Sequence, residues 1–388
     1  MVQIIRHRPP FFSRQSPSVV TARGIHGMIH PMGYERENIR RMAGYTPGEQ
    51  PDGDQVIKLN TNENPHPPSP KVMTTLKAIE AETLRRYPSP TAATFLAAAA
   101  RYHALAPDQL VATNGGDELL RLAITTFVEP GQPIGIAAPS YSLYPVLADI
   151  HGSPVHAVEL ADDWSVPETF AEQMNAAGAP LTLLVNPHAP SGRLTPQREI
   201  AAIASALNGV LLVDEAYVDF ADPGHDVTGL VQHHDNLLIL RTLSKGYSLA
   251  GLRLGYGIGC RGLIAPMAIK TRDSYSVDAV ADAVGAAAIE DQRYARQTWQ
   301  SVRAERERVI TALRERNFQV PDSQANFCLA RLPANAARPA RDIQEGLRQE
   351  GILIRHFDTD RLADCLRISI GTTEQNTRLL QRLWEWMC

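Results

Sequence analysis

The stretch Thr242–Gly257, TLSKGYSLAGLRLGYG, joins the end of one short apolar run to the start of another. Such runs, bounded by turn residues, are typical of buried strands in a parallel sheet. Between them lies Lys245, whose small and apolar neighbours would lower its pKa and free its amine to attack a carbonyl group. Ser244 and Arg253 carry a hydroxyl and a guanidinium, which suit a phosphate. Most lysines are solvated surface residues, so this interpretation needs support from elsewhere in the chain.

The same alternation of apolar runs and helical segments extends from residue 57 to residue 272. It predicts an α/β fold in which a large domain has a mostly parallel central sheet. Predicted strands are 109–113, 133–137, 181–185, 210–213, 236–240 and 254–259, and predicted helices are 70–87, 94–103 and 117–127.

After residue 272 the pattern changes, which predicts a smaller α+β domain. Long helices are expected at 278–290 and 293–316, and the second is heavily charged, as a solvated helix would be. Strands at 325–330, 352–355 and 366–370 and a helix at 340–350 follow. A last helix runs from about residue 373 to the end, with Thr372 or Thr373 as its N-cap.

Length and composition exclude several classes of protein. A chain of 388 residues exceeds the about 250–300 residues that one core supports, so two domains are expected. The net charge of −4 argues against broad nucleic-acid binding. No apolar run approaches the about 20 residues of a membrane span. The four cysteines form no C-x-x-C pair, so we predict no metal site and a reducing, cytoplasmic location.

The first 41 residues differ from the rest, with seven arginines and only two acidic residues. An organelle transit peptide has this composition, but three prolines interrupt any amphipathic helix. We predict a flexible extension over residues 1–44, or a start codon assigned too early, with Met28 or Met32 as the true start.

Two further stretches complement the lysine. In GVLLVDEAYVDF (209–220), Asp214 ends an apolar strand, where it can pair with a cationic ring nitrogen or simply begin a turn. In VATNGGDELL (111–120), glycines precede a helix whose N-terminus offers free N–H groups to an anion. Each pattern alone is weak. Together with Lys245 they predict a pyridoxal phosphate site.

With these residues identified, the chain resembles fold-type I aminotransferases and, among them, the histidinol-phosphate aminotransferase group. The resemblance covers residues from about Tyr45 to the C-terminus and depends on the order and spacing of many motifs. It implies an arm at 45–80 that contributes to the small domain and to a dimer, a large cofactor-binding domain at 81–272 and a small domain at 273–388. The motifs are YTPGEQP (45–51), LNTNENP (59–65), RRYPSP (85–90), NGGDE (114–118), PSYSLYP (139–145), NPHAPSG (186–192), DEAY (214–217), TLSK, GLRLG and LRISIGT (366–372).

The resemblance also implies a role for each matching residue. Lys245 would hold the cofactor covalently and shuttle a proton, Asp214 would keep the pyridine nitrogen protonated, and Tyr217 would hydrogen-bond the phenolic oxygen. Tyr141 would stack on the ring, although a core aromatic is the alternative. Further cofactor contacts would come from Gly116, Asp117, Asn186, Ser244, Arg253 and, across the dimer, Tyr87. The substrate would contact Asn64, Arg355 and Arg367.

The sequence departs from the family pattern at two places. The family often reads N-P-N-N-P-T-G, and here Ala189 stands where an asparagine amide normally helps to hold the cofactor oxygen. His66 follows N-E-N-P, where many relatives have a tyrosine, and it could equally be a surface histidine. Both departures put the cofactor environment and the substrate in doubt.

The leading hypothesis is an aminotransferase of histidine biosynthesis. It would convert histidinol phosphate and 2-oxoglutarate into imidazole-acetol phosphate and glutamate, as a homodimer with shared active sites and without nucleic-acid or membrane partners. The alternatives are a threonine-phosphate decarboxylase-like enzyme and a broad aromatic or other amino acid aminotransferase. A non-catalytic regulator on the same scaffold is a fourth hypothesis. Lys245 and Asp214 argue against it, and the N-terminal segment is too short for a DNA-binding domain.

Overall fold

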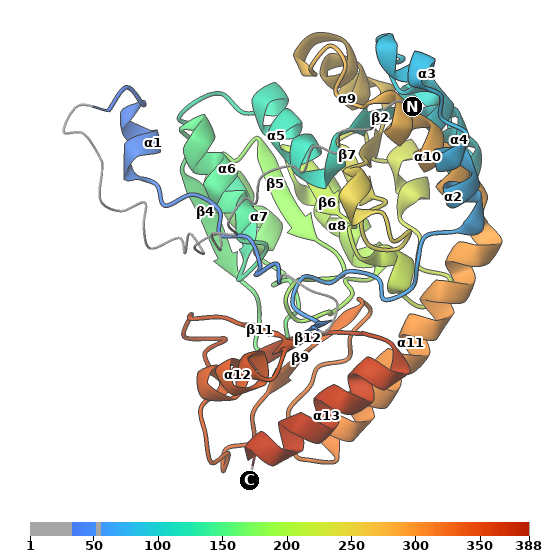
Figure 1. Ribbon diagram of the computed structural model, residues 1–388. Helices are drawn as coiled ribbons and strands as arrows, with labels where there is room; N and C mark the ends of the chain where they lie inside the picture. Colours follow the sequence, from blue (N-terminus) through green and yellow to red (C-terminus); the bar gives the residue numbers. More distant parts are fainter. Residues whose placement is uncertain (1–32, 52–55, 388) are drawn as a thin grey trace, which may run out of the picture. The chain divides into compact units, whose positions relative to one another are not determined.

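The computed structural model describes residues 33–51 and 56–387 (Figure 1). Most of the predicted extension, residues 1–32, lies outside the described residues. The chain divides into two compact units after Met42. The described part of the first contains a short helix, α1 (Glu37–Arg41). The second unit contains all the other described elements.

A seven-stranded sheet in the order β2-β8-β7-β6-β5-β3-β4 forms the centre of this unit. Strand β8 runs antiparallel to both of its neighbours, and the other neighbouring pairs are parallel. The predicted α/β fold with a mostly parallel sheet is therefore confirmed. The strands are β2 (Leu110–Thr113), β3 (Ile134–Ala138), β4 (Val155–Glu159), β5 (Leu181–Val185), β6 (Val210–Asp214), β7 (Leu237–Thr242) and β8 (Gly255–Gly259).

Both faces of this sheet are buried, which explains why its strands are apolar throughout. Successive side chains point to opposite faces, so Leu211 and Val213 of β6 enter one apolar core and Leu212 enters the other. Helices supply the outer layers of both cores (Figure 1). The Leu212 face is covered by α5 (Gly115–Phe127), α6 (Leu143–His151) and α9 (Arg261–Pro266), and the other by α4 (Ala93–His103), α7 (Phe170–Ala176), α8 (Gln197–Ala206) and α10 (Ala279–Glu290).

The C-terminal part has its own sheet, with three antiparallel strands in the order β11-β12-β9. Helix α11 (Gln292–Arg314), about 35 Å long, leads into it along one side of the molecule (Figure 1). A separate parallel pair joins β1 (Ile57–Lys58) to β10 (Ile352–Leu353), so the N-terminal arm pairs with the C-terminal part. The other elements here are β9 (Phe327–Arg331), β11 (Arg355–His356), β12 (Cys365–Ser369), α12 (Ala340–Gln349) and α13 (Thr373–Met387).

Helix α13 begins with a capping box. The Thr372 hydroxyl accepts a hydrogen bond from the Gln375 backbone amide at 3.2 Å, and the Gln375 side chain accepts one from the Thr372 amide at 3.0 Å. This reciprocal pair satisfies two backbone donors that the first turn of a helix leaves free. Thr372 is thus the N-cap, one of the two residues predicted.

The structure differs from the predicted elements at three places. The single helix expected at 70–87 is two helices, α2 (Pro70–Lys77) and α3 (Ala81–Arg85), and Ile79 packs against the core at the break. The strand expected at 352–355 is split between β10 and β11, which belong to different sheets. Strand β4 was not predicted. It lies at the edge of the sheet and is only partly buried, so it lacks an apolar run.

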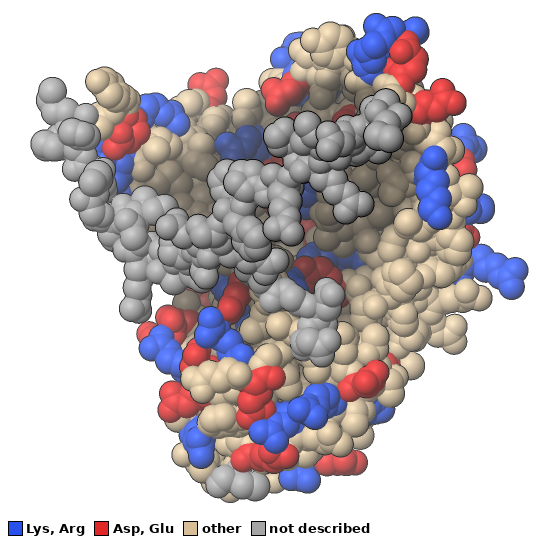
Figure 2. Space-filling view, in the orientation of Figure 1, with Lys and Arg blue, Asp and Glu red and all other residues tan. Residues whose placement is uncertain are grey.

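Surface charge and helix lengths add two observations. Acidic and basic side chains are interspersed over the C-terminal part of the face shown in Figure 2. Among the described residues, no helix combines the length and the apolar character needed to cross a membrane.

Gly255, the first residue of β8, allows this strand to lie against the start of α5. A Cβ at this position would come within 2.6 Å of the Gly115 carbonyl carbon and 2.8 Å of the Gly116 nitrogen. We expect Gly255→Ala to lower the free energy of unfolding by about 1–3 kcal/mol, because the backbone at the start of α5 cannot easily move away from the added methyl group. Urea denaturation measures the loss.

The control for this substitution is Gly262→Ala in α9. A Cβ there would meet only the Cys260 Sγ, at an ordinary 3.5 Å. The control should change the free energy of unfolding by less than about 0.5 kcal/mol, or raise it, because alanine favours a helix. Equal stability of the two variants would show that the start of α5 can move aside freely.

Candidate active site

The predicted site residues follow strands that end at one edge of the central sheet. Strands β3, β5, β6 and β7 are mutually parallel, and β2 has the same direction because both β2 and β7 are antiparallel to β8. Their carboxyl ends therefore meet at a single edge, where ligands bind in sheets of this kind. The residues after these ends include Gly116, Tyr141, Asn186, Tyr217 and Lys245.

Lys245 lies just beyond β7 with its amine directed at the N-terminal arm. Its Nζ donates a hydrogen bond to the Thr61 carbonyl oxygen at 2.8 Å. Burial lowers the pKa of Lys245 to about 8, and the nearby Glu63 carboxylate partly opposes this shift. About a tenth of the amine is therefore uncharged at pH 7, far more than for an ordinary lysine, and nucleophilic attack requires this uncharged form.

Asp214 ends β6 and is almost completely buried. Its carboxylate accepts hydrogen bonds from the Tyr144 hydroxyl at 2.8 Å and from the Ala216 amide at 3.1 Å. Burial raises the pKa of Asp214 to about 6, although both bonds act against the shift. Its hydrogen-bond partners are thus a phenol and an amide rather than a cation. A buried carboxylate with only neutral hydrogen-bond partners is suited to pair with a cationic ring nitrogen.

The arm segment Asn60–Asn64 contacts four parts of the site in turn. The Asn60 carbonyl accepts from Arg367 at 2.9 Å, and the Thr61 carbonyl accepts from Lys245. The Asn62 side chain donates to the Tyr217 hydroxyl at 3.3 Å, and the Asn64 side chain donates to the Gly246 carbonyl at 3.1 Å. Asn64, predicted to bind substrate, thus also holds the loop that carries the lysine.

The start of α5 and two polar side chains form a candidate phosphate site. The Arg253 guanidinium packs on Gly115, where a Cβ would come within 2.6 Å of its Nη2. Arg253 also pairs with the Asp117 carboxylate at 3.4 Å. The hydroxyl of Ser244 lies on the same loop as Lys245 and accepts a hydrogen bond from Thr242. Free helix amides, a guanidinium and a hydroxyl are suitable donors for a phosphate.

Arg355 and Arg367 form a cationic pair on the C-terminal sheet. They face each other across β11 and β12 in register, and both guanidinium groups lie over the Phe357 ring, at 5.6 and 5.5 Å. Burial lowers the pKa of Arg367, and the neighbouring Arg355 acts in the same direction. Among the described residues, Nε of Arg367 has no hydrogen-bond partner. A buried donor of this kind can bind an anionic group.

Comparison with known proteins identifies the family. Residues 54–383 match the family model described as aminotransferase class I and II. The chain belongs to this family. This aminotransferase is 42% identical to histidinol-phosphate aminotransferase 1 of Trichormus variabilis, over 90% of this chain and 98% of that protein. It is 41% identical to the histidinol-phosphate aminotransferase of Citrifermentans bemidjiense, over 90% and 97% of the two chains.

Solved structures agree with this assignment. The histidinol-phosphate aminotransferase of Sinorhizobium meliloti, crystallised with pyridoxal-5'-phosphate, is 26% identical and superposes with a TM-score of 0.84 over 92% of this chain and 98% of that one. A Thermus thermophilus aspartate aminotransferase mutant, 19% identical with a TM-score of 0.76 over 92% and 100% of the two chains, shares the fold. The predicted fold-type I aminotransferase with pyridoxal phosphate as cofactor is confirmed.

Several predicted residues of the aminotransferase make contacts other than those expected. Both groups of the Asn186 amide bind the backbone of Thr195, at 2.7 and 3.2 Å. The Tyr141 hydroxyl donates to Asp117 at 3.4 Å, and its ring meets those of Tyr45 and Tyr144 edge to face. Their cofactor contacts remain predictions.

Tyr87 is 81% exposed and stacks on Tyr275, with ring centroids 4.6 Å apart. Among the residues that the structure describes, no hydrogen bond or ring contact joins Tyr87 to another predicted site residue.

The two departures from the family pattern have ordinary surroundings. Ala189 is buried in the apolar core that contains Phe327. His66 is half-buried, and burial lowers its pKa. The effects of Ala189 on the cofactor and of His66 on the substrate remain predictions.

Sequence reasoning missed two hydrogen-bond partners of the predicted catalytic residues Asp214 and Lys245. Tyr144 lies three residues after Tyr141, and this helical spacing was the available signal. The Thr61 carbonyl is a backbone group 184 positions from Lys245, and no sequence signal indicated it.

The raised pKa of Asp214 predicts how stability depends on pH. The folded value of about 6 exceeds the about 3.9 of an unfolded chain, so the folded state binds this proton more tightly. The stability that this proton contributes is present below about pH 4 and is lost as the pH rises through about 6. Because asparagine cannot ionise, we expect cofactor-free Asp214→Asn protein to be more stable than wild type at pH 8 by about 2–3 kcal/mol.

Urea denaturation between pH 4 and pH 8 checks this expectation. The difference between Asp214→Asn and wild type should shrink towards pH 4. Asp163→Asn, at an exposed carboxylate, serves as the control and should not show this rise with pH. A stability difference for Asp214→Asn that stays flat across this pH range would show that Asp214 is not destabilised by burial.

Proposed function

We propose that this aminotransferase transfers the amino group of histidinol phosphate to 2-oxoglutarate, which forms imidazole-acetol phosphate and glutamate in histidine biosynthesis. The observation that carries the proposal is the pair Arg355 and Arg367, in which the buried Nε of Arg367 has no hydrogen-bond partner in the described part of the chain. Arg367 lies close enough to Lys245 to lower the pKa of the lysine. The two amino compounds of the reaction, histidinol phosphate and glutamate, are both anionic. The same arginines can therefore bind the phosphate of histidinol phosphate and a carboxylate of glutamate in turn. The names of the relatives support this substrate.

The residues of the site suit the roles proposed for them. Pyridoxal phosphate, when bound, supplies an electron sink for the negative charge that develops on the substrate carbon. Asp214, oriented by Tyr144, would pair with the ring nitrogen. Tyr217, oriented by Asn62, would bind the phenolic oxygen. The amides at the start of α5, Ser244 and Arg253 would hold the phosphate.

Lys245 would move the proton. Once its amine leaves the Thr61 carbonyl, its Nζ would be free to accept a proton from the substrate carbon and to give it up again. The pKa of about 8 keeps both protonation states populated near neutral pH, which is the condition for efficient general acid–base catalysis.

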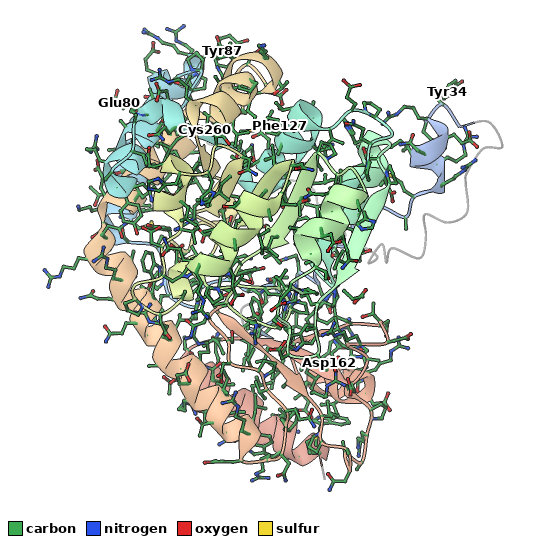
Figure 3. The ribbon with its side chains drawn as sticks, turned by 180° about the vertical axis from the view of Figure 1, so that it is seen from behind. Tyr34, Glu80, Tyr87, Phe127, Asp162 and Cys260 are labelled. Atoms are coloured by element: carbon green, nitrogen blue, oxygen red, sulfur yellow. The ribbon has the colours of Figure 1, made fainter. Side chains whose placement is uncertain are left out.

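The same proposal includes a cytoplasmic homodimer. Tyr87 lies at the periphery of the molecule beyond α3 (Figure 3), and Leu84, Ile269 and Tyr275 are further exposed large hydrophobic residues of α3 and of the segment after α9. Exposed apolar area of this kind indicates an interface. Tyr87 would contribute its hydroxyl to the partner's cofactor phosphate. We also propose the domain boundaries of the sequence analysis. The β1–β10 pairing supports the place of the arm in the small domain, and the free thiols of Cys260, Cys328 and Cys365 support the cytoplasm.

A spectroscopic titration tests the substrate. The visible band of the purified protein should fall on addition of histidinol phosphate and return with 2-oxoglutarate, with glutamate as product. Lys245→Ala should lower turnover by about 10²–10⁴-fold because it removes the proton carrier, whereas Lys270→Ala, at the surface, should not. Release of carbon dioxide from threonine phosphate would instead favour the decarboxylase. A band that responds only to aromatic amino acids would favour the broad aminotransferase.

Substitution of Tyr87 tests the shared site. Tyr87→Phe should weaken binding of pyridoxal phosphate by up to about tenfold, because one hydrogen bond to the partner's cofactor is lost. Tyr294→Phe is the matched control, since the hydroxyl of this partly exposed tyrosine donates to the Pro67 carbonyl of its own chain. Light scattering should give twice the chain mass of 42.6 kDa. A dimer in which both variants bind the cofactor like wild type would refute the role of Tyr87.

A further inference from the structure

His188 bridges two loops at the edge of the central sheet. Its Nε2 lies 2.8 Å from the Pro139 carbonyl oxygen and its Nδ1 lies 2.7 Å from the Ser191 hydroxyl. A carbonyl can only accept, so Nε2 carries the proton and Ser191 donates to Nδ1. Burial lowers the pKa of His188 to about 4, which keeps the ring neutral and these two bonds intact at neutral pH.

The two loops are the ones that carry predicted cofactor residues. Pro139 precedes Tyr141 by two positions in the loop after β3, and His188 follows Asn186 by two positions in the loop after β5. The His188 ring therefore fixes the separation of the loops. The family often has asparagine at this position. The shorter asparagine side chain can take the place of Nδ1 in the bond with Ser191 but cannot also reach the Pro139 carbonyl.

Trp164 packs against the face of this histidine. The two rings are nearly parallel, with centroids 5.8 Å apart and an interplanar angle of 28°. Trp164 is buried and has a φ of 68°, in the left-handed region that a bulky residue adopts only where its surroundings hold it. The turn at residues 161–165 is thus constrained to present the indole to His188.

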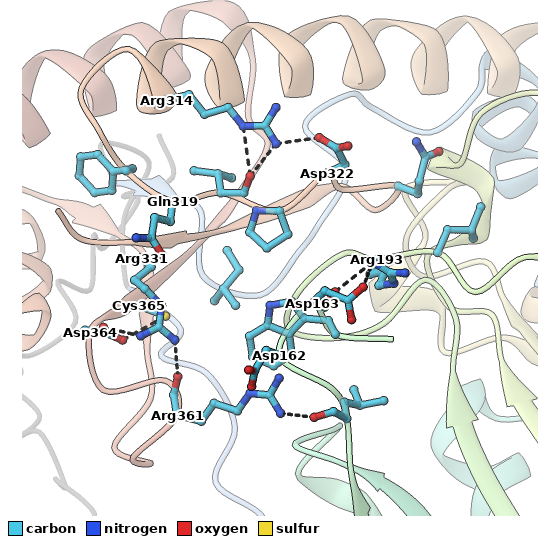
Figure 4. A pocket seen from close by; sticks show the side chains of 18 of the residues that line it. Asp162, Asp163, Arg193, Arg314, Gln319, Asp322, Arg331, Arg361, Asp364 and Cys365 are labelled. Atoms are coloured by element: carbon cyan, nitrogen blue, oxygen red, sulfur yellow. Dashed lines mark hydrogen bonds and ion pairs between the residues drawn. The ribbon is translucent and has the colours of Figure 1, made fainter. Parts of the chain in front are cut away.

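Arg361 supplies that constraint from the C-terminal part of the chain. Its guanidinium lies 4.1 Å from the centre of the Trp164 ring and donates to the carbonyls of Leu160 and Ala161, at 2.7 and 2.5 Å. Leu160, Trp164 and Arg361 line a groove of about 1590 Å³, and Figure 4 shows Arg361 extending toward the segment that carries Asp162 and Asp163. The contacts form one chain from Arg361 through Trp164 to His188.

We propose that His188 is a positioning residue of the cofactor site, and that Arg361 acts on it through Trp164. The C-terminal sheet would then help to set the geometry of the loops that carry Tyr141 and Asn186. This inference rests on the proposed placement of the cofactor at those residues.

Binding of pyridoxal phosphate to cofactor-free protein tests the proposal, followed by absorbance, together with the thermal unfolding of the same cofactor-free samples. Glutamine can place a donor near the position of Nε2, whereas asparagine cannot reach Pro139. We expect His188→Asn to weaken binding by about tenfold and His188→Gln by only about threefold. Arg361→Met should also weaken binding by about threefold. The effect of the double variant His188→Asn/Arg361→Met should be smaller than the product of the single effects, because the residues act along one path.

His151→Gln is the matched control. The Nε2 of His151 lies 2.8 Å from the Val128 carbonyl, the same kind of bond at the far end of α6. This variant should unfold at a lower temperature and keep the wild-type affinity for the cofactor.

Three outcomes would overturn the proposal. If both His188 variants unfold earlier but bind the cofactor like wild type, His188 is only a core residue. If the effects of His188→Asn and Arg361→Met simply multiply, the link through Trp164 is wrong. If wild-type protein binds no pyridoxal phosphate, the proposed function fails, and this inference with it. Should His188→Asn not fold, the affinities of His188→Gln and Arg361→Met decide between a positioning and a purely structural role.

Discussion

The common direction of five strands is the constraint on which the rest of this molecule depends. Because β2, β3, β5, β6 and β7 all end at one edge, residues more than a hundred positions apart in sequence come together there. The antiparallel β8 is consistent with this arrangement, since it begins at the same edge, and Arg253 lies two residues before its first residue. A reversal of any one of these strands would carry its site residue to the opposite end of the sheet.

The site places two ionisable groups in surroundings that oppose their charged forms. Burial raises the pKa of Asp214 and lowers that of Lys245, so each group is less stable in its usual charged form. In a folded protein this costs free energy, and stabilising substitutions at such sites commonly reduce function. The structure limits the cost with neutral partners, the Tyr144 hydroxyl and the Thr61 carbonyl, which orient both groups without supplying an opposite charge.

The sequence predicted the elements well where local pattern decided them. The apolar runs located β5 and the start of β6 to the residue, because strands buried on both faces are apolar at every position. The prediction failed where tertiary contacts determine the secondary structure. The break between α2 and α3 and the partly exposed edge strand β4 have no strong local signal. The same holds within the site. Lys245, Asp214 and Arg253 stand in recognisable motifs, whereas the partners of Lys245 and of Trp164 come from distant segments and include backbone carbonyls, which every residue possesses.

The pairing of the N-terminal arm with the C-terminal part has a consequence for synthesis. The Ile57 and Leu59 amides bind the carbonyls of Gly351 and Leu353, and the Asn62 carbonyl accepts from the Asn326 side chain. The ribosome makes the arm first, yet these partners emerge about three hundred residues later. At about 5–20 residues per second, the arm stays without them for at least about fifteen seconds. The nascent chain can thus build its central sheet well before Thr61 and Asn62 have a fixed place beside Lys245 and Tyr217. A ribosome-bound chain that stops short of β10 would then carry the lysine but not the surroundings that tune it.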